Sequence, residues 1–152
     1  MGVPGHRLDR MLNPKTVVVI GDKGPNYTWL TNNLPFKDKG GNLYSVQIDE
    51  KEIPGIEALG VTNLKSLADV PEPIDYALVA VPRQISPYVL KDLIAVKAAG
   101  AAFFTSGFAE TGEELGIKLQ ETILGMAREA NFPIVGPNCM GLHVPKSRLA
   151  MT

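Results

Sequence analysis

The feature that most constrains this chain is a series of short apolar runs that end in Gly, Pro or a small polar residue. The first run spans residues 16–21 and is rich in β-branched side chains, and a second strong run spans residues 75–82. Continuous apolar runs of this length are typical of strands that are buried on both faces of a parallel sheet. Further strands are predicted at 42–48, 101–105 and 133–136, with a brief extended piece at 61–62.

Segments with helical spacing or capping residues lie between these runs. Short helices are predicted at 26–33, with Asn26 as N-cap, at 53–59 and near 65–70. Strands that alternate with helices favour right-handed βαβ units. The pattern therefore predicts an α/β fold, a Rossmann-like doubly wound and mainly parallel sheet with helices on both faces.

Two later helices are predicted from their terminal residues. One has Ser86 as N-cap and Pro87 at its first helical position, and it is expected to end at Gly100. For the other, Thr111 and Glu114 have the spacing of a capping box, and apolar residues recur every three or four positions over 115–130.

The size and composition of the chain narrow the class of protein. Its 152 residues are enough for one domain, and 45% hydrophobic residues exclude a disordered chain. A net charge of −1 with 7% aromatic residues argues against a nucleic-acid partner. The apolar runs are shorter than the ~20 residues of a membrane span. With one cysteine, no metal-ligand cluster and no secretory leader, we expect a cytoplasmic domain that binds neither metal nor membrane.

Three parts of the chain are distinguished. Residues 1–14 form an N-terminal lead-in, in which Leu8 and Met11 suggest a short helix. Residues 15–147 form the Rossmann-like domain, and residues 148–152 begin a linker or tail.

The site of such a fold lies where its strands end. Ligands of open parallel sheets bind beyond the carboxyl ends of the strands. These ends are rich in glycine, proline and small polar residues, which let a ligand approach the backbone. The segments concerned are 21–26, 47–51, 81–83, 105–110 and 136–139.

The first of these segments allows a nicotinamide-dinucleotide interpretation. The fingerprint for that ligand has glycine at positions 21, 23 and 26, where this chain has Gly21, Lys23 and Asn26. A helix that begins after the turn would favour an anion by ~0.3–1 kcal/mol, and Lys23 adds a positive charge. Asp49 is placed to accept hydrogen bonds from ribose hydroxyls. An NAD-binding domain of an oxidoreductase therefore stays open as an alternative.

Four motifs in order resemble the NDP-forming acyl-CoA synthetases. They are LDRMLNPKTVVVIG at 8–21, SLADVPEPIDYALVAVP at 66–82, TSGFAETG at 105–112 and GPNCMGL at 136–142. Together they resemble the CoA-binding domain that this family shares with the succinyl-CoA synthetase alpha subunit. The likeness spans about residues 8–147, and the order of the motifs makes it specific.

The resemblance implies coenzyme A or acyl-CoA as the ligand. The first turn would hold phosphate, segments 47–51 and 81–83 would flank adenosine, and Lys51 or Arg83 would pair with phosphate. The last two segments would line the path of the pantetheine arm. The candidate CoA-binding residues are Gly21, Asp22, Lys23, Gly24, Asn26, Gln47, Ile48, Asp49, Lys51, Val81, Pro82, Arg83, Ser106, Gly107, Phe108, Asn138, Cys139 and Met140.

The resemblance also implies that the chain does not catalyse alone. Glu110 matches an acid that helps to handle a phosphohistidine in complete family members, so it is a catalytic candidate only together with further synthetase domains or a subunit. The family's phosphorylated histidine lies in a second, flavodoxin-like domain, and neither His6 nor His143 matches it. We likewise expect no ATP-grasp module within these 152 residues. A regulatory module that senses acyl-CoA, fused to an acetyltransferase, is a further alternative.

Two departures from the family pattern concern the nucleotide. Asp22 and Lys23 replace small residues of the first turn, and Ile48-Asp49 stand where relatives have Asn-Pro. Asp22 would repel a diphosphate at this turn unless its side chain points away. The second departure predicts altered recognition of adenosine or a different nucleotide.

Overall fold

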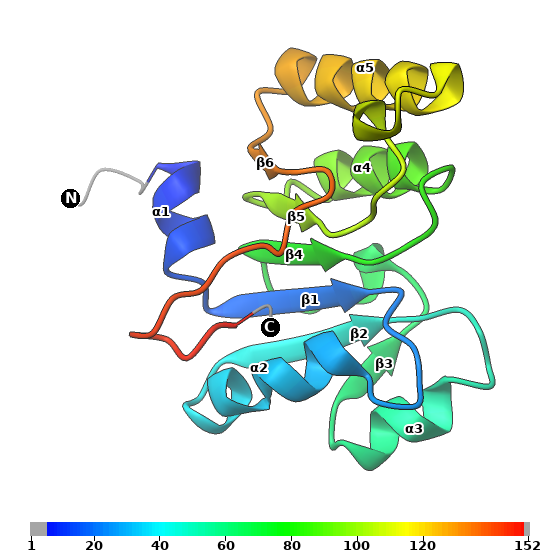
Figure 1. Ribbon diagram of the computed structural model, residues 1–152. Coiled ribbons are helices and arrows are strands. Elements are labelled where there is room, and N and C mark those ends of the chain that lie inside the picture. The colour runs from blue at the N-terminus through cyan, green and yellow to red at the C-terminus, as the bar shows by residue number, and fades with distance from the viewer. Residues whose placement is uncertain (1–5, 151–152) are drawn as a thin grey trace.

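A six-stranded, all-parallel sheet forms the centre of the molecule, in a computed structural model that describes residues 6–150. The strand order is β3-β2-β1-β4-β5-β6 (Figure 1). This order is the doubly wound arrangement, with its switch point between β1 and β4, and it confirms the predicted fold class. The strands are β1 (Thr16–Ile20), β2 (Asn42–Val46), β3 (Thr62–Leu64), β4 (Tyr76–Val79), β5 (Ala101–Phe103) and β6 (Ile134–Val135).

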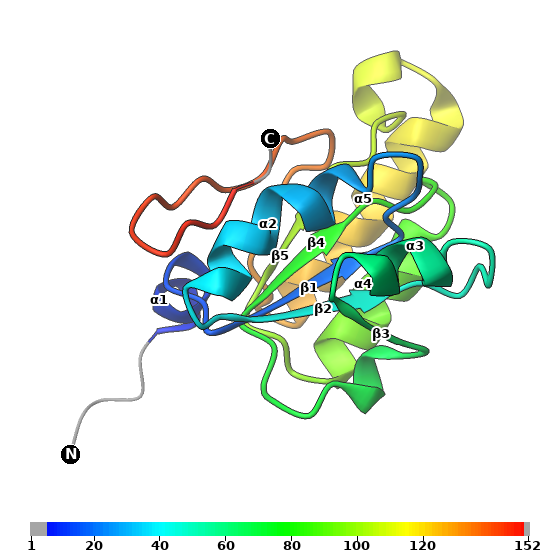
Figure 2. The same ribbon diagram turned by 90° about the horizontal axis from the view of Figure 1, so that it is seen from below.

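Helices cover both faces of this sheet. Figures 1 and 2 place α2 on the opposite side of the sheet from α4. Helices α2 and α3 contribute to the core on one face, and α4, α5 and the short helix η1 contribute to the core on the other. The helices are α1 (Arg7–Leu12), α2 (Thr28–Asp38), α3 (Ile53–Ala58), α4 (Ser86–Ala95) and α5 (Glu114–Glu129), with 3₁₀ turns η1 (Leu67–Asp69) and η2 (Ala109–Thr111).

The β1 run is apolar throughout because alternate side chains enter the two cores. Val17 and Val19 pack with Leu30 of α2, whereas Val18 packs with Leu90 of α4. Successive side chains of a strand point to opposite faces, so a strand covered on both sides needs apolar residues at every position. Each buried valine of this kind contributes roughly 1.5–3 kcal/mol to folding.

A carboxylate holds the amino ends of β1 and β4 together. Asp75 is nearly buried, and one of its oxygens accepts from Nε of Arg10 on α1 at 2.8 Å. Its other oxygen accepts from the backbone N–H groups of Lys15 and Thr16, at 2.9 and 3.1 Å. Asp75 therefore links α1 and the start of β1 to the start of β4.

The predicted start of α2 is wrong. The helix begins at Thr28 rather than after Asn26, it follows Tyr27 in a left-handed conformation, and it continues through Pro35 to Asp38. The side chain of Tyr27, the N-cap residue, makes no capping hydrogen bond to the helix. The carboxylate of Asp22, at the end of β1, accepts from a first-turn amide of α2 instead, so a residue outside the local pattern caps the helix.

The predicted ends of α4 are also wrong. Ser86 is its first helical residue and not its N-cap, and the helix ends at Ala95, before Lys97 takes a left-handed conformation. Gly100 serves packing rather than helix termination. A Cβ at Gly100 would lie 2.5 Å from Sδ of Met11, so the absence of a side chain lets α1 pack here.

The predicted capping box at Thr111 is absent. Thr111 ends η2, its Oγ1 donates to the carbonyl of Phe108, and the N–H of Glu113 donates to that Oγ1. Helix α5 begins only at Glu114, because Gly112 turns the chain in a left-handed conformation between the two helices. A capping box does occur at η1, between Ser66 and Asp69.

The segment after β6 returns to the α2 side of the sheet. Leu149 is fully buried in the core on that face, and Val144 pairs with it in an antiparallel bridge. The amide of Asn33 on α2 donates to the carbonyl of Ala150 at 2.6 Å. The boundaries proposed at residues 14 and 147 stay predictions, and residues 1–5 and 151–152 lie outside the described part.

Candidate functional site

The five predicted segments meet at one edge of the sheet because all its strands run in the same direction (Figure 1). Nε2 of Gln47 donates to the carbonyl of Asp22 at 2.9 Å. Oγ1 of Thr105 donates to the carbonyl of Val81, and the N–H of Asn138 donates to the carbonyl of Thr105 at 2.9 Å. Direct hydrogen bonds thus join the first segment to the second, and the fourth segment to both the third and the fifth.

Gly21 brings the first and third segments into contact at the switch point. It has a φ of 84°, a conformation that glycine adopts without strain. A Cβ at this position would lie 2.8 Å from Cγ1 of Val81 and 2.9 Å from the carbonyl oxygen of Ala80. The absence of a side chain therefore lets the ends of β1 and β4 approach closely.

An apolar pocket of about 250 Å³ opens at this edge, on the face covered by α4. Most of its lining side chains are aliphatic or aromatic, with Lys65 and Asp92 as its charged residues. The volume is below the ~300–1,000 Å³ of pockets that hold a whole drug-sized ligand, so it fits one ring system of a larger molecule. The lining residues are Ile20, Gly21, Val46, Ile48, Lys65, Ser66, Leu67, Val81, Ile85, Tyr88, Val89 and Asp92.

A second hollow, of about 370 Å³, lies at the opposite edge, between residues such as Pro14, Lys15 and Asn42. It borders the amino ends of β1 and β2, where an open parallel sheet does not bind its ligand. The smaller pocket at the carboxyl edge is therefore the candidate site. Ile48 and Tyr88 at this pocket are exposed, at 82% and 68%.

The first turn contains a buried acid. Asp22 has no exposed surface, and its two oxygens accept from the N–H of Lys23 at 2.9 Å and from that of Leu30, in the first turn of α2, at 2.8 Å. Burial raises the pKa of Asp22 above its ordinary value, and the hydrogen bonds from Leu30 and Lys23 oppose that shift. The side chain points into the protein, whereas Lys23, Gly24 and Asn26 are exposed.

Residues after β2 are held by local contacts. Gln47 uses its whole amide within the protein, because its Oε1 accepts from the N–H of Asp49 at 3.0 Å while its Nε2 binds the first turn. Oδ1 of Asp49 accepts from the N–H of Lys51 at 3.1 Å, and both side chains are exposed. Asp49 and Lys51 therefore face solvent beside the pocket.

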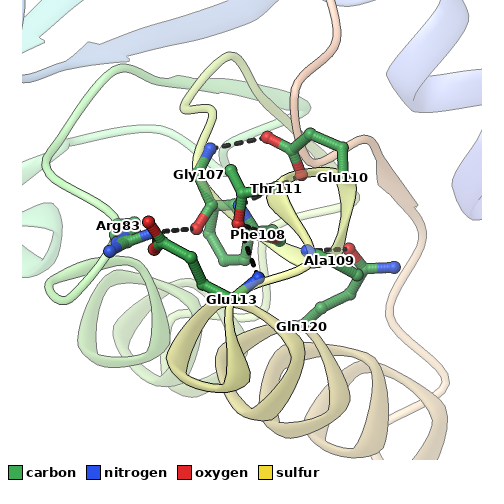
Figure 3. Close-up of polar contacts among 8 residues, drawn as sticks. All are labelled: Arg83, Gly107, Phe108, Ala109, Glu110, Thr111, Glu113 and Gln120. Atoms are coloured by element: carbon green, nitrogen blue, oxygen red, sulfur yellow. Dashed lines mark hydrogen bonds and ion pairs between the residues drawn. The ribbon is translucent and has the colours of Figure 1, made fainter.

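Arg83 organises the segment after β5 (Figure 3). Its Nη1 donates to the carbonyl of Gly107 and forms an ion pair with Glu113 at 2.9 Å. The ring of Phe108 is fully buried in the core on the α4 side, while Ser106 is exposed. To bind a phosphate, Arg83 would have to keep its hydrogen bond to Gly107 at the same time or break its ion pair with Glu113.

Glu110 closes the same loop from the other side (Figure 3). Its Oε1 accepts from the N–H of Gly107 at 2.6 Å, and its Oε2 accepts from that of Phe108 at 3.0 Å. The hydrogen bond from Gly107 is the largest of the effects that hold the pKa of Glu110 below its ordinary value, with further lowering from Phe108 and from the charge of Arg83.

We expect the loop to depend on this charge. Because the pKa of Glu110 is lowered in the folded state, its contacts contribute fully above the ordinary glutamate range and are lost only as the pH falls through the lowered value. NMR titration of the Gly107 and Phe108 amides should show a midpoint below 4.5, the ordinary value. The midpoint should vanish in Glu110→Gln, and a midpoint at or above the ordinary value would contradict the expectation.

The last segment is tied to β5. Asn138 takes a left-handed conformation with a φ of 50°, and Sγ of Cys139 accepts from the N–H of Gly141 at 3.4 Å. Met140 is exposed beside them. His143 is exposed, and His6 is exposed and caps α1 through its Nδ1.

Sequence reasoning missed part of the pocket. Lys65 and Ser66 directly follow β3, so they obey the same strand-end rule that selected the other segments. Ile85 and Tyr88 lie at the start of α4 and carried no signal, because helical spacing does not separate a pocket wall from a core position. Glu52, at the start of α3, was missed as a partner of the first turn.

Neither a metal centre nor a membrane span is found in the described part. Over residues 6–150, no three His, Cys, Asp or Glu side chains gather as metal ligands. None of the helices described there is long and apolar enough to cross a membrane.

Known proteins match the chain over nearly its whole length. Trans-feruloyl-CoA synthase FCS1 from an unknown prokaryotic organism is 36% identical over 96% of this chain and 20% of its own length. The alpha subunit of acetate–CoA ligase [ADP-forming] II from Pyrococcus furiosus is 31% identical, over 95% of this chain and 31% of its own. The chain thus spans about a fifth to a third of these relatives.

Solved structures agree. A crystal structure of a Pyrococcus horikoshii OT3 protein has a TM-score of 0.82 at 32% identity, covering 95% of this chain and 32% of that one. The apo form of the dinucleotide forming acetyl-coenzyme A synthetase 1 of Ca. Korarchaeum cryptofilum has a TM-score of 0.80 at 27% identity, covering 95% and 31%.

The family profile of the CoA binding domain matches residues 15–145. That match covers the sheet, the pocket and all five strand-end segments. The resemblance that the four motifs predicted is therefore confirmed, and the chain belongs to the CoA-binding domain family that is similar to the corresponding part of ADP-forming acyl-CoA ligases.

Proposed function

We propose that this chain binds coenzyme A or acyl-CoA, with the adenine ring of the nucleotide head in the pocket between β2 and α4. The observation that carries the proposal is an apolar pocket, of a size for one ring system, at the switch-point edge of a CoA-binding domain. The edge at which ligands of open parallel sheets bind supports the same placement.

The pocket residues suit a planar base. Ile20, Val46 and Leu67 offer a buried apolar floor, and the exposed ring of Tyr88 stands where it can cover a bound base. Stacking of a base on an aromatic ring tolerates different bases, so hydrogen bonds at the rim set the selectivity. Lys65 is the cation in the pocket lining, and it would pair with a phosphate of the nucleotide head.

The rest of the ligand extends along the same edge. In this proposal the pantetheine arm runs from the switch point past Ser106 toward Asn138 and Met140, all of which are exposed. Cys139 lies half-buried beside this path.

We further propose that the domain works as part of an acyl-CoA synthetase. Its relatives are ADP-forming CoA ligases and a CoA synthase, and it matches only a part of their length. The acid–thiol ligation would need their further domains or subunits, and Glu110 would have a catalytic role only there. A sensor of acyl-CoA is the second candidate, and a cytoplasmic location stays a prediction.

A calorimetric titration of the 152-residue chain with CoA, acetyl-CoA and NAD tests the proposal. We expect saturable binding of CoA and acetyl-CoA, and NAD binding that is weaker by at least about tenfold, which corresponds to ~1.4 kcal/mol. Absence of heat and of any thermal shift at millimolar CoA would overturn it. Tighter binding of NAD than of CoA would reverse the order in favour of an oxidoreductase domain.

A further inference from the structure

The first turn of this fold presents backbone donors, and the chain's own carboxylates already accept from them. The N–H groups of Lys23 and Leu30 donate to Asp22, and the N–H of Gly24 donates to Oε2 of Glu52 at 2.8 Å. Tyr27 donates its N–H to the carbonyl of Lys23 and its hydroxyl to the carbonyl of Glu52. Residue 25 is a proline and has no N–H to offer.

These contacts place two negative charges at the first turn, a buried one on Asp22 and one on Glu52. Asp22 is fully buried against the start of α2, an 11-residue helix whose N-terminal amides favour an anion. Glu52 reaches the outer side of the turn from the start of α3. The two acids are close enough that the charge of Glu52 acts on the pKa of Asp22.

We infer that Asp22 and Glu52 are specificity-determining residues that exclude a diphosphate from the first turn. A diphosphate placed there would meet like charges and would find the amides of Lys23, Gly24 and Leu30 occupied, so to bind them it would have to displace the carboxylates. Asp22 is not free to move aside, because it is buried and capping α2.

This inference rests on the proposed function and deepens it. If CoA binds at this edge, its affinity comes from the base in the pocket, the phosphate near Lys65 and the pantetheine arm. Its diphosphate then lies in solvent over the turn and adds little. The ligand class selected here is therefore a nucleotide held by its base and not by its diphosphate.

The experiment compares adenosine, ADP and inorganic pyrophosphate on the wild-type chain and three variants. Asp22→Ser keeps a small polar group that can cap the helix and removes the charge. Glu52→Gln keeps an acceptor for Gly24 and removes the other charge. Glu57→Gln is the matched control, because Glu57 is an exposed acid of α3 with no contact to the turn.

For the wild-type chain we expect ADP to bind no more than about threefold tighter than adenosine, and pyrophosphate not to bind measurably. Each of Asp22→Ser and Glu52→Gln should raise the ratio of ADP to adenosine affinity, or create pyrophosphate binding, by at least about tenfold, within the range of helix N-terminal effects. Glu57→Gln should leave both unchanged.

The outcomes separate this inference from the proposed function. If the wild-type chain binds neither adenosine nor CoA but Asp22→Ser gains pyrophosphate binding, the proposed function fails and the inference holds. If ADP binds the wild-type chain tenfold tighter than adenosine does, or if neither variant gains affinity, the inference is overturned, and the separate CoA titration still decides the proposed function. Circular dichroism checks the fold of Asp22→Ser, and if that variant is unfolded, the result for Glu52→Gln decides alone.

Discussion

Replacing Asp75 with alanine is expected to lower the free energy of unfolding by about 2–4 kcal/mol, because it leaves two backbone donors near the buried start of β1 without an acceptor. The change also removes the ion pair with Arg10, at 2.7 Å. We assign little of the lost stability to this ion pair, because the Arg10 side chain is 37% exposed and can be solvated by water instead.

Urea denaturation followed by circular dichroism measures this loss, and thermal unfolding should show a drop of roughly 5–15 °C for a chain of this size. Asp75→Asn keeps one acceptor oxygen and should fall between wild type and alanine. Asp38→Ala, at an exposed position at the end of α2, is the matched control and should stay within about 0.5 kcal/mol of wild type. A loss of that small size in Asp75→Ala would show that the strand ends do not depend on the carboxylate.

The largest expected effect on binding comes from Tyr88, the exposed aromatic residue of the pocket. Stacking of a base on an aromatic ring is worth ~1–3 kcal/mol, so Tyr88→Ala should weaken CoA binding by about 5- to 150-fold. The ring is 68% exposed, so its removal should leave the stability nearly unchanged. Calorimetric titration with CoA measures the effect.

Two variants give this prediction its contrast. Tyr88→Phe keeps the ring and should bind CoA within about twofold of wild type, since only the hydroxyl is lost. Leu115→Ala removes another exposed apolar side chain, on α5 and away from the pocket lining, and should not change the affinity. If Tyr88→Ala binds CoA like wild type, adenine does not occupy this pocket, and the CoA that binds is held elsewhere on the chain.

Much of the architecture could be predicted because burial imposes a local pattern. Residues 17–20 had to be apolar at every position once both faces of β1 were covered, and that requirement is visible in the sequence. The same is true of Tyr76–Val79 in β4. The strand-end rule then located the five segments, since every strand of a parallel sheet ends at the same edge.

Helix termini were predicted less well because distant residues took the roles of local ones. Asn26 has the chemistry of an N-cap, but Asp22 accepts from the amide of Leu30 and makes that cap unnecessary. Thr111 has a capping-box spacing to Glu114, but Thr111 ends η2 and its hydroxyl donates to the carbonyl of Phe108. Gly100 is typical of a helix end, but a glycine is needed there because Met11 of α1 packs against it.

The sequence by itself determined the layered α/β fold, the edge of the sheet at which a ligand is expected and, through four ordered motifs, the CoA-binding family. Only the tertiary structure decided which carboxylates accept from the amides of the first turn and which side chains line the pocket. Glu52 lies 28 positions from Gly24, and Tyr88 comes from a different βαβ unit than Ile48. Such contacts depend on how the helices pack over the sheet, so patterns among residues that are neighbours in the sequence do not predict them.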